Sequence, residues 1–532
     1  MIAGPSGCGK STIASAINGL IPFAYKGTIT GSLKVQGKET RDMSIFELSH
    51  IVGTVLQDTD AQFIGMTVAE DIAFSMENDC RPTDEMHRRV SEIAKTLELE
   101  AHLLHAPGEL SGGQKQRVSV GGVMVDDVDV FLFDEPLANL DPATGRQAME
   151  MIDEIHRLTG AAVIVIEHRL EDVLHIQMDR IILMQDGRIA ADTSPDELLV
   201  SDKLQKAGIR EPLYVTALKY AGVRPVEEQR LSGIKTLTLD VCDKAQVRAW
   251  YQETAEEERR PSGEPFLEVS DLDFTYESGF RAAKSISAKI RKGEMLAVVG
   301  KNGAGKTTFA KLICGFEKPQ KGRMLLGGED MLSLSIKERA EHIGYVMQDP
   351  NQMLCKTMIF DEVALGLVNR GKDSEYIHDK VHQVLKICGL YPFRNWPVSA
   401  LSYGQKKRVT IASILALDPE MIILDEPTAG QDFRHYTEIM EFLRELNRSG
   451  LTVVMITHDM HLMLEYSERA LVFCDGTIIK DATGAEILTD PETVEKAALK
   501  ETSLYYLSEQ CGIKDARSFV QRFIDHDRRA RA

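Results

Sequence analysis

Short runs of branched apolar residues recur along the chain, and turn-forming or charged residues bound each run. The strongest runs hold only four to six residues, the length of a buried strand and too short for a separate helix. Such runs are typical of strands buried on both faces of a parallel sheet. None approaches the roughly 18 apolar residues that a membrane-spanning helix needs. The strongest are Ala161–Ile166, Met295–Val299, Met421–Leu424 and Leu451–Ile456.

Four sequence motifs occur twice, at an offset of 290 to 296 residues. One register shared by four separate segments indicates the duplication of a whole domain rather than a short-period repeat. Together with the strand-like runs, the duplication predicts two tandem domains with mainly parallel sheets. The pairs are Gly4–Ser11 and Gly300–Thr307, Leu110–Gln114 and Leu401–Gln405, Phe131–Pro136 and Ile422–Pro427, and Ile166–His168 and Ile456–His458.

The duplication predicts the division of the chain. We expect a first domain over residues 1–205, a linker with a small element over 206–265, a second domain over 266–501 and a C-terminal tail over 502–532. The stretch 252–264 is charged and contains Pro and Gly, which is typical of a solvated linker. The tail ends in Arg528, Arg529 and Arg531, and we expect a solvated helix end there.

The two copies are unequal at their beginnings. The second copy has 31 residues, Phe266–Leu296, ahead of the point that matches Met1. These residues include strand-like segments that lead into the glycine-rich motif, so the first copy opens midway through a strand. Two explanations stay open: the sequence is a fragment of a longer protein, or the natural chain has a damaged first site.

The glycine-rich motif G-x-x-x-x-G-K-[ST] predicts a phosphate-binding loop. Its glycines let backbone N–H groups curl around phosphate oxygens, and the next helix points its N-terminus at the anion. The lysine then reaches the terminal phosphates, and the hydroxyl that follows is a ligand for Mg²⁺. The candidate nucleotide-binding residues are Gly4, Gly7, Gly9, Lys10, Ser11 and Thr12, and Gly300, Gly303, Gly305, Lys306, Thr307 and Thr308.

Polar residues that follow apolar strands complete the predicted chemistry. A carboxylate at the end of a strand can hold Mg²⁺, and the next glutamate can activate the attacking water. A neutral amide can contact both the metal ion and the attacking water, and a histidine can contact the γ-phosphate. The metal candidates are Asp134 and Asp425 with Ser11, Thr307, Gln57 and Gln348. The catalytic candidates are Glu135, Glu426, His168 and His458.

The motif Leu-Ser-Gly-Gly-Gln, called the signature below, is the most specific of the repeated motifs. Together with the phosphate loops, these motifs resemble the ABC-type ATPase domain, twice over. The resemblance implies two tandem α/β domains, each with a mainly parallel sheet and a helical subdomain that contains the signature. The resemblance implies that each signature binds the γ-phosphate held by the opposite domain, so that Lys10 faces Ser402 and Lys306 faces Ser111. The domains would pair within the chain or between two chains. The signature residues expected to bind nucleotide are Ser111, Gly113, Ser402 and Gly404.

The resemblance also assigns smaller features. Tyr276 matches the aromatic residue that stacks on adenine, and the first copy lacks that position. Tyr403 replaces the first signature glycine in the second copy, which suggests that the two sites differ in rate. The D-loops of the family map onto residues 138–141 and 429–432.

Composition narrows the choice of partner. The chain has 62 basic and 81 acidic residues, for a formal charge of −19, so nucleic acid is not expected as the main partner. The eight cysteines form no C-x-x-C pair, which favours reduced thiols over zinc ligands. No secretory leader is predicted, since residues 1–4 have no charged region.

A protein of this type without membrane spans must act on separate membrane subunits if it drives transport. The segments 58–68 and 349–358 resemble those of energy-coupling factor (ECF) importers of vitamins and metal ions. Phe63, Ile64 and Met66, with Met353 and Leu354, are either an apolar docking patch for membrane partners or part of the core. The resemblance places the chain on the cytoplasmic side of the cell membrane, with ATP and Mg²⁺ as cofactors.

Two other readings stay open. A subunit of another ABC importer has the same motifs. An ABC-F-type translation factor also has two ATPase domains without spans, but its usual Thr-Asn-His-Leu-Asp is replaced here by residues 137–141 and 428–432. Its interdomain arm should be basic, whereas residues 252–264 have a net negative charge. A DNA-repair ABC ATPase is disfavoured because zinc cysteines and long insertions are missing.

Overall fold

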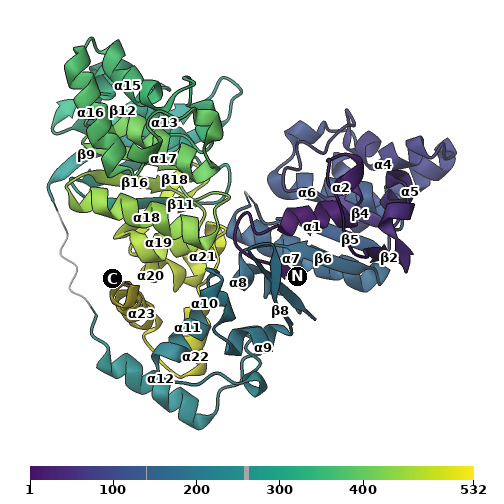
Figure 1. Cartoon of the computed structure of the whole chain (residues 1–532). Coiled ribbons are helices and arrows are strands. Elements are labelled where there is room, and N and C mark those ends of the chain that lie inside the picture. The colour runs from purple at the N-terminus through teal and green to yellow at the C-terminus, as the bar shows by residue number, and fades with distance from the viewer. Residues whose placement is uncertain (139, 257–262, 532) are drawn as a thin grey trace. The chain divides into compact units, whose positions relative to one another are not determined.

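The computed structural model describes residues 1–138, 140–256 and 263–531. The chain forms two compact units, Met1–Val247 and Arg248–Ala532, and the boundary falls inside helix α12 (Val241–Glu253). Figure 1 colours both units along the chain. Part of the predicted linker, residues 257–262, lies outside the described residues.

Each unit is built on a six-stranded sheet, and the two sheets have the same strand order. The last strand of each is antiparallel to its neighbour and the others are parallel. The predicted α/β fold is therefore confirmed. In order across the sheets, the strands are β4 (Val52–Val55), β5 (Val130–Asp134), β6 (Ala162–Ile166), β1 (Ile2–Ala3), β7 (Ile181–Gln185) and β8 (Arg188–Thr193), and β14 (Ile343–Val346), β15 (Met421–Asp425), β16 (Thr452–Ile456), β11 (Met295–Gly300), β17 (Arg469–Cys474) and β18 (Thr477–Ala482).

The central strands are the apolar runs that the sequence indicated. Every residue of β11, β15 and β16 is buried, because helices cover one face of the sheet and a helix with strands of a second sheet covers the other. The burial predicted for the fourth run is only partly met, since β6 begins exposed. Parallel strands end at one edge of the sheet, which brings the polar residues that follow them together. This edge carries the candidate site in each unit.

A second, antiparallel sheet distinguishes the units. In the second unit it has four strands, and among the described residues of the first unit only a two-stranded counterpart is present. Strands β9 and β10 correspond to the segment that the first copy lacks. The strands are β10 (Arg281–Arg291), β9 (Pro265–Thr275), β12 (Lys321–Leu326) and β13 (Glu329–Asp330), and in the first unit β2 (Lys34–Val35) and β3 (Lys38–Glu39).

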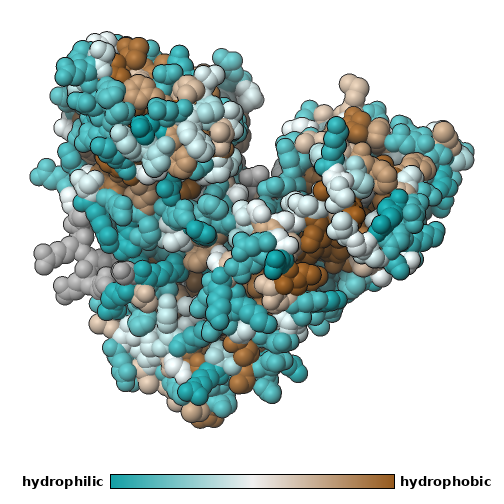
Figure 2. All heavy atoms as spheres, viewed as in Figure 1, coloured by the Kyte–Doolittle hydropathy of each residue, from teal (hydrophilic) through white to brown (hydrophobic). Residues whose placement is uncertain are grey.

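This difference changes the burial of the helix that follows each phosphate loop. Helix α13 (Lys306–Cys314) has seven buried residues, whereas α1 (Lys10–Ile17) has two. Apolar residues of the first unit are correspondingly exposed, such as Phe23 and Tyr25 after α1 and Ile189 on β8. Figure 2 shows apolar residues gathered on the first unit around α1 and the neighbouring strands.

In each unit, three helices form the subdomain that contains the signature. In the second unit these helices lie at one end, as Figure 1 shows. Their apolar faces join the core that also covers one face of the sheet. They are α4 (Val68–Asn78), α5 (Thr83–Thr96) and α6 (Gly112–Met124), and α15 (Ile359–Asn369), α16 (Ser374–Ile387) and α17 (Tyr403–Leu415).

The remaining helices connect and flank the strands. The first three helices after the last sheet strand have a similar order in both units, and α11 and α22 stand 290 residues apart, in the register of the duplication. These helices are α2 (Leu20–Phe23), α3 (Ile45–Ser49), α7 (Pro142–Thr159), α8 (Leu170–Val173), α9 (Pro195–Val200), α10 (Lys203–Lys206) and α11 (Leu213–Tyr220), and α14 (Ile336–Arg339), α18 (Phe433–Arg448), α19 (Met460–Tyr466), α20 (Gly484–Leu488), α21 (Pro491–Lys496), α22 (Ser503–Gln510) and α23 (Ala516–Arg531).

The C-terminal helix end is exposed at Arg529, Ala530 and Arg531, as predicted, but most of the rest of the helix is packed. Helix α23 buries Phe519, Val520, Phe523 and Ile524. Its last turns are also held, because Arg528 Nε donates to the carbonyl of Glu465 at 2.6 Å and Arg531 forms an ion pair with the Glu465 carboxylate. The amphipathic spacing of the apolar residues, rather than the terminal charges, therefore decides where the helix packs.

Within the described ranges 1–138, 140–256 and 263–531, no helix has the length and apolar character needed to cross a membrane.

Candidate functional site

The two phosphate loops adopt the same backbone conformation. Gly9 and Gly305 precede α1 and α13 with φ of +103° and +102°, values that favour glycine. A Cβ on Gly305 would also lie 2.4 Å from the carbonyl oxygen of Ala282. The loops thus turn their N–H groups inward and aim a helix N-terminus at the space they enclose, as an anion site requires.

The loop lysines lie inside these turns. Lys10 Nζ donates to the carbonyls of Gly4 and Pro5 at 2.8 and 3.1 Å. Lys306 Nζ makes the matching bonds to Gly300 and Lys301, at 2.7 and 2.9 Å. Each ammonium group is nearly buried and held at the centre of its loop, where phosphate oxygens are its natural partners.

A hydroxyl and a carboxylate meet beside each loop. Ser11 Oγ lies 3.4 Å from Asp134 Oδ1, and Thr307 Oγ1 donates to Asp425 Oδ2 at 3.2 Å. Burial raises the pKa of both aspartates, which indicates carboxylates that lack a sufficient positive neighbour. A hydroxyl and a carboxylate are the hard oxygen donors that Mg²⁺ prefers, so the residues fit this metal.

The predicted catalytic glutamates occupy a strained backbone conformation. Glu135 and Glu426 follow β5 and β15 with φ of +49° and +47°, which is uncommon for residues other than glycine. Each N–H donates at 2.9 Å to the carbonyl of the residue that ends the next strand, Ile166 or Ile456. Strain of this kind concentrates at functional sites, and here the same geometry occurs twice.

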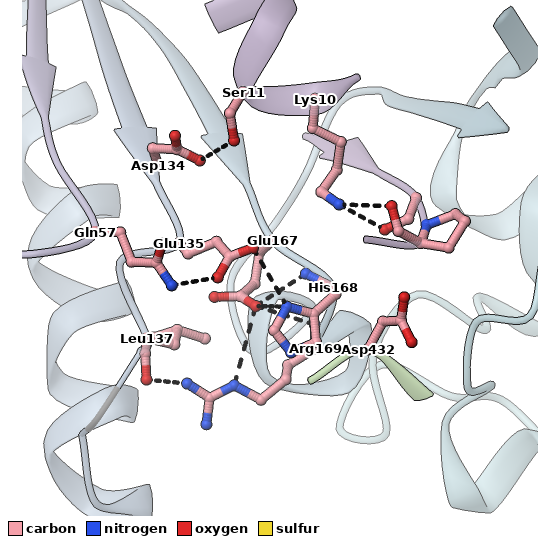
Figure 3. A network of polar contacts seen from close by, with 12 residues as sticks. Lys10, Ser11, Gln57, Asp134, Glu135, Leu137, Glu167, His168, Arg169 and Asp432 are labelled. Carbon is pink, nitrogen blue, oxygen red and sulfur yellow. Dashed lines mark hydrogen bonds and ion pairs between the residues drawn. The ribbon is translucent and has the colours of Figure 1, made fainter. Parts of the chain in front are cut away.

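The predicted glutamine and histidine converge on the glutamate in different ways. In the first unit, Gln57 Nε2 donates to Glu135 Oε2 at 2.8 Å, and His168 Nδ1 lies 3.8 Å from Glu135 Oε1. Figure 3 shows these side chains around the end of β5. In the second unit, His458 Nδ1 lies 2.8 Å from Glu426 Oε1. The structure therefore brings both residues to Glu135 in the first unit and the histidine to Glu426 in the second.

Sequence reasoning missed Glu167 in the first unit. This carboxylate is fully buried, and its Oε1 lies 3.2 Å from His168 Nδ1. Burial acts to lower the pKa of His168, but Glu167 and Glu135 outweigh it and raise that pKa. Burial likewise acts to raise the pKa of Glu135, but His168 and Lys10 lower it. The second copy has Thr457 in place of Glu167, so this extra charge is particular to the first site.

Two residues of the second site were also missed. Tyr345 OH donates to Asp425 Oδ2 at 3.0 Å. Lys407, on the signature helix α17, is 1% exposed, and burial lowers its pKa to about 8 against the opposing charges of Asp425, Glu426 and Asp349. Nothing in a single sequence shows that such a tyrosine or lysine will lie beside the site.

The signature serines begin helices. Ser111 and Ser402 are the N-caps of α6 and α17, and each forms a capping box with the glutamine three residues later. Gly113 lies close to α7, since a Cβ there would be 2.8 Å from Thr144 Cγ2. The tyrosine in the second signature, Tyr403, is turned toward its own domain, where its OH lies 3.3 Å from the carbonyl of Gln348.

Residues expected to lie near adenine and in the D-loops have simple local roles. Tyr276 OH is 3.0 Å from Thr308 Oγ1, which places this ring beside the start of α13. Asp141 and Asp432 are the N-caps of α7 and α18. Asn139 of the first D-loop lies outside the described residues.

The suggested docking patch differs between the copies. In the first unit Ile64 and Met66 are 64% and 83% exposed. The loop that carries them is fixed because Asp71 Oδ1 accepts from the N–H groups of Ile64 and Gly65 at 2.8 and 3.0 Å. In the second unit Met353 and Leu354 pack against the core, as Phe63 does in the first.

Comparison with known proteins places these motifs in a family. The sequence model described as "ABC transporter" matches residues 1–138 and 283–429. A second model, described as "ATP-binding cassette cobalt transporter", matches residues 201–274, and a model for an AAA domain matches 394–465.

Curated relatives align along the whole chain. A protein of Clostridium perfringens named "Putative ABC transporter ATP-binding protein" is 56% identical over 100% of this chain and 93% of its own length. A protein of the same name from Enterococcus faecalis is 53% identical over 100% and 93%. Among solved structures, cbiO1 of C. perfringens, described as part of the ABC transporter complex cbiONQ, is 34% identical with a TM-score of 0.42, over 46% of this chain and 99% of that one.

Proposed function

The chain belongs to the ABC transporter family of ATP-binding proteins, and from this premise we propose that its ATPase activity powers import of a small solute through separate membrane subunits. The solute would be a vitamin or a metal ion, and the assembly would be of the ECF type. The chain would lie on the cytoplasmic face of the cell membrane and contact its partners through the signature subdomains.

One observation carries the proposal beyond ATP hydrolysis. Residues 201–274 match a model whose description names a cobalt transporter, and these residues lie outside the ATPase motifs. The exposed Ile64 and Met66 add support, because adjacent apolar side chains held on an ordered loop fit the contact of a soluble subunit with a membrane partner. An acidic chain of this kind fits a ribosome poorly.

The geometry suggests how ATP is hydrolysed in the second unit. The loop and Lys306 bind the phosphates, and Tyr276 lies beside the loop for the base. When bound, Mg²⁺ held by Thr307, Asp425 and Gln348 would neutralise charge on the γ-phosphate. Glu426 orients the attacking water and accepts its proton, and His458 fixes that carboxylate at 2.8 Å.

The first unit would use Ser11, Asp134 and Gln57 for Mg²⁺, with Glu135 and His168 at the water. We propose that each signature serine completes the site of the opposite domain, within one chain or between two. ATP binding would then bring the domains together, and hydrolysis would release them. That movement would be transmitted to the membrane subunits.

The test is affinity purification of the tagged chain from detergent-solubilised membranes. We expect integral membrane transport subunits to co-purify with the parent chain and to be lost with Ile64→Glu and Met66→Glu. The matched control is Leu158→Glu, because Leu158 on α7 is 61% exposed and lies outside the proposed contact. Equal recovery from all variants would contradict the docking patch, and recovery of ribosomes without membrane subunits would contradict import.

A further inference from the structure

A buried lysine links the signature helix of the second unit to the loop that begins with Gln348. Lys407 Nζ donates to the carbonyls of Met347 and Gln348 at 3.0 and 2.7 Å, and it lies 3.5 Å from the carbonyl of Glu426. The side chain comes from the second turn of α17, five residues after the N-cap Ser402. A charged group that is 1% exposed stays ionised only where such partners surround it.

Tyr403 reinforces this link from the first turn of the same helix. Its OH lies 3.3 Å from the carbonyl oxygen of Gln348, so that one oxygen accepts from both Tyr403 and Lys407. Two residues four positions apart lie on one face of a helix, which explains why both reach the same loop. The backbone of Gln348 is thereby tied to α17 at two points.

The first unit is built differently at both positions. Its residues 291 positions earlier are Gly112, which has no side chain, and Gln116. The Gln116 amide donates to the carbonyl of Pro136 at 3.0 Å, after the catalytic strand, instead of toward Gln57. The replacement of both residues together makes the two-point link a particular property of the second unit.

We propose that Lys407 is a positioning residue for ATP hydrolysis, which with Tyr403 fixes the backbone of Gln348 to the signature helix of the second unit. The fixed backbone directs the Gln348 side chain toward the metal and the attacking water beside Glu426. It also joins the loop of one nucleotide site to the helix that begins at Ser402. The proposal rests on the role proposed for Gln348 at the nucleotide and not on import.

The test is steady-state hydrolysis of ATP by the purified full chain, with ATP and Mg²⁺ varied independently. Lys407→Gln introduces the residue that the chain itself uses in the first unit. We expect kcat to fall about tenfold and the Mg²⁺ concentration for half-maximal rate to rise about fivefold, while the KM for ATP changes less than about twofold. A residue that only supported folding would lower the melting temperature without changing the Mg²⁺ requirement.

Tyr403→Phe is the second variant, since it removes one hydroxyl and keeps the ring on the surface of α17. It should change kcat and the Mg²⁺ requirement in the same direction, by about two- to threefold. The matched control is Lys406→Gln, because the neighbouring ammonium binds the exposed Asn351 Oδ1 at 3.0 Å. Its kinetics should equal those of the parent chain.

A double-mutant cycle tests whether Lys407 acts through Gln348 or independently of it. If the link acts through Gln348, Lys407→Gln should have little further effect in a Gln348→Ala background. Additive effects would overturn the link, as would unchanged Mg²⁺ dependence in both Lys407→Gln and Tyr403→Phe. Should Lys407→Gln fail to fold, the proposal is judged on Tyr403→Phe alone, and an unchanged Mg²⁺ requirement in that variant overturns the link. An inert Gln348→Ala would instead refute the proposed role of Gln348.

Discussion

Replacement of Glu426 by glutamine should stop ATP hydrolysis at the second site and leave ATP binding intact. Glutamine has nearly the same volume, so it can follow the φ of +47° at this position and still accept from His458 Nδ1 at 2.8 Å. The variant loses only the negative charge and the ability to take a proton from water. The lysine and hydroxyl groups that bind the phosphates are unchanged.

The expected magnitude follows from those contacts. A positioned general base contributes about 10²- to 10⁴-fold to rate, so in a Glu135→Gln background we expect kcat to fall by at least about 100-fold. Weakening of one hydrogen bond to a charged partner costs about 1 kcal/mol of folding stability, which is small for a domain of this size. The Kd for ATP should change less than about threefold, because the groups that contact the phosphates remain.

The assay compares phosphate release with equilibrium ATP binding, and the retained nucleotide is identified after rapid filtration. The variant should retain ATP, whereas the parent chain should retain ADP. The control is Glu445→Gln, an exposed glutamate on α18, which should hydrolyse ATP at the parental rate. The rate lost in Glu135→Gln then gives the share of total ATP hydrolysis that the first site contributes. With the first site silenced by Glu135→Gln, hydrolysis that stays within about threefold when Glu426→Gln is added would refute the assigned role.

Three further predictions concern single features. Tyr345→Phe removes a donor to Asp425 at 3.0 Å and should raise the Mg²⁺ requirement about threefold; an unchanged titration would contradict this. Against the opposing effect of burial, Glu167 helps to raise the pKa of His168. Protonated His168 therefore stabilises the first unit fully below its unfolded pKa of about 6.5, and this contribution is lost as pH rises through the raised value. Glu167→Gln should lower that pKa in an NMR titration, and a constant value would oppose the assignment. Fusion of residues 265–296 to the N-terminus should raise the melting temperature of the first unit in calorimetry by covering apolar surface; no shift would show that this surface does not accept the strands.

The sequence predicted the features that depend on local patterns. The short apolar runs identified β6, β11, β15 and β16 within one residue at each end. The last three are buried on both faces, where no polar residues interrupt the run, whereas β6 is only partly buried. The repeated motifs predicted which polar residues meet, since parallel strands end at a common edge. Those features followed from the spacing of the motifs and from the family resemblance.

Features set by tertiary packing could not be predicted in the same way. Lys407 has the appearance of a surface residue in the sequence, and only the fold shows it buried against Gln348. The terminal arginines suggested a solvated end, although the apolar face of α23 determines its packing. Glu167 lies in an apolar strand context that gave no sign of its contact with His168.

The most direct test of the central claim is the ATPase rate of the chain in liposomes with and without the membrane subunits that co-purify with it. Import through such subunits predicts a several-fold higher rate with them, which Glu426→Gln abolishes and Ile64→Glu reduces to the rate of the chain alone. The same rate with and without membrane subunits would contradict the account.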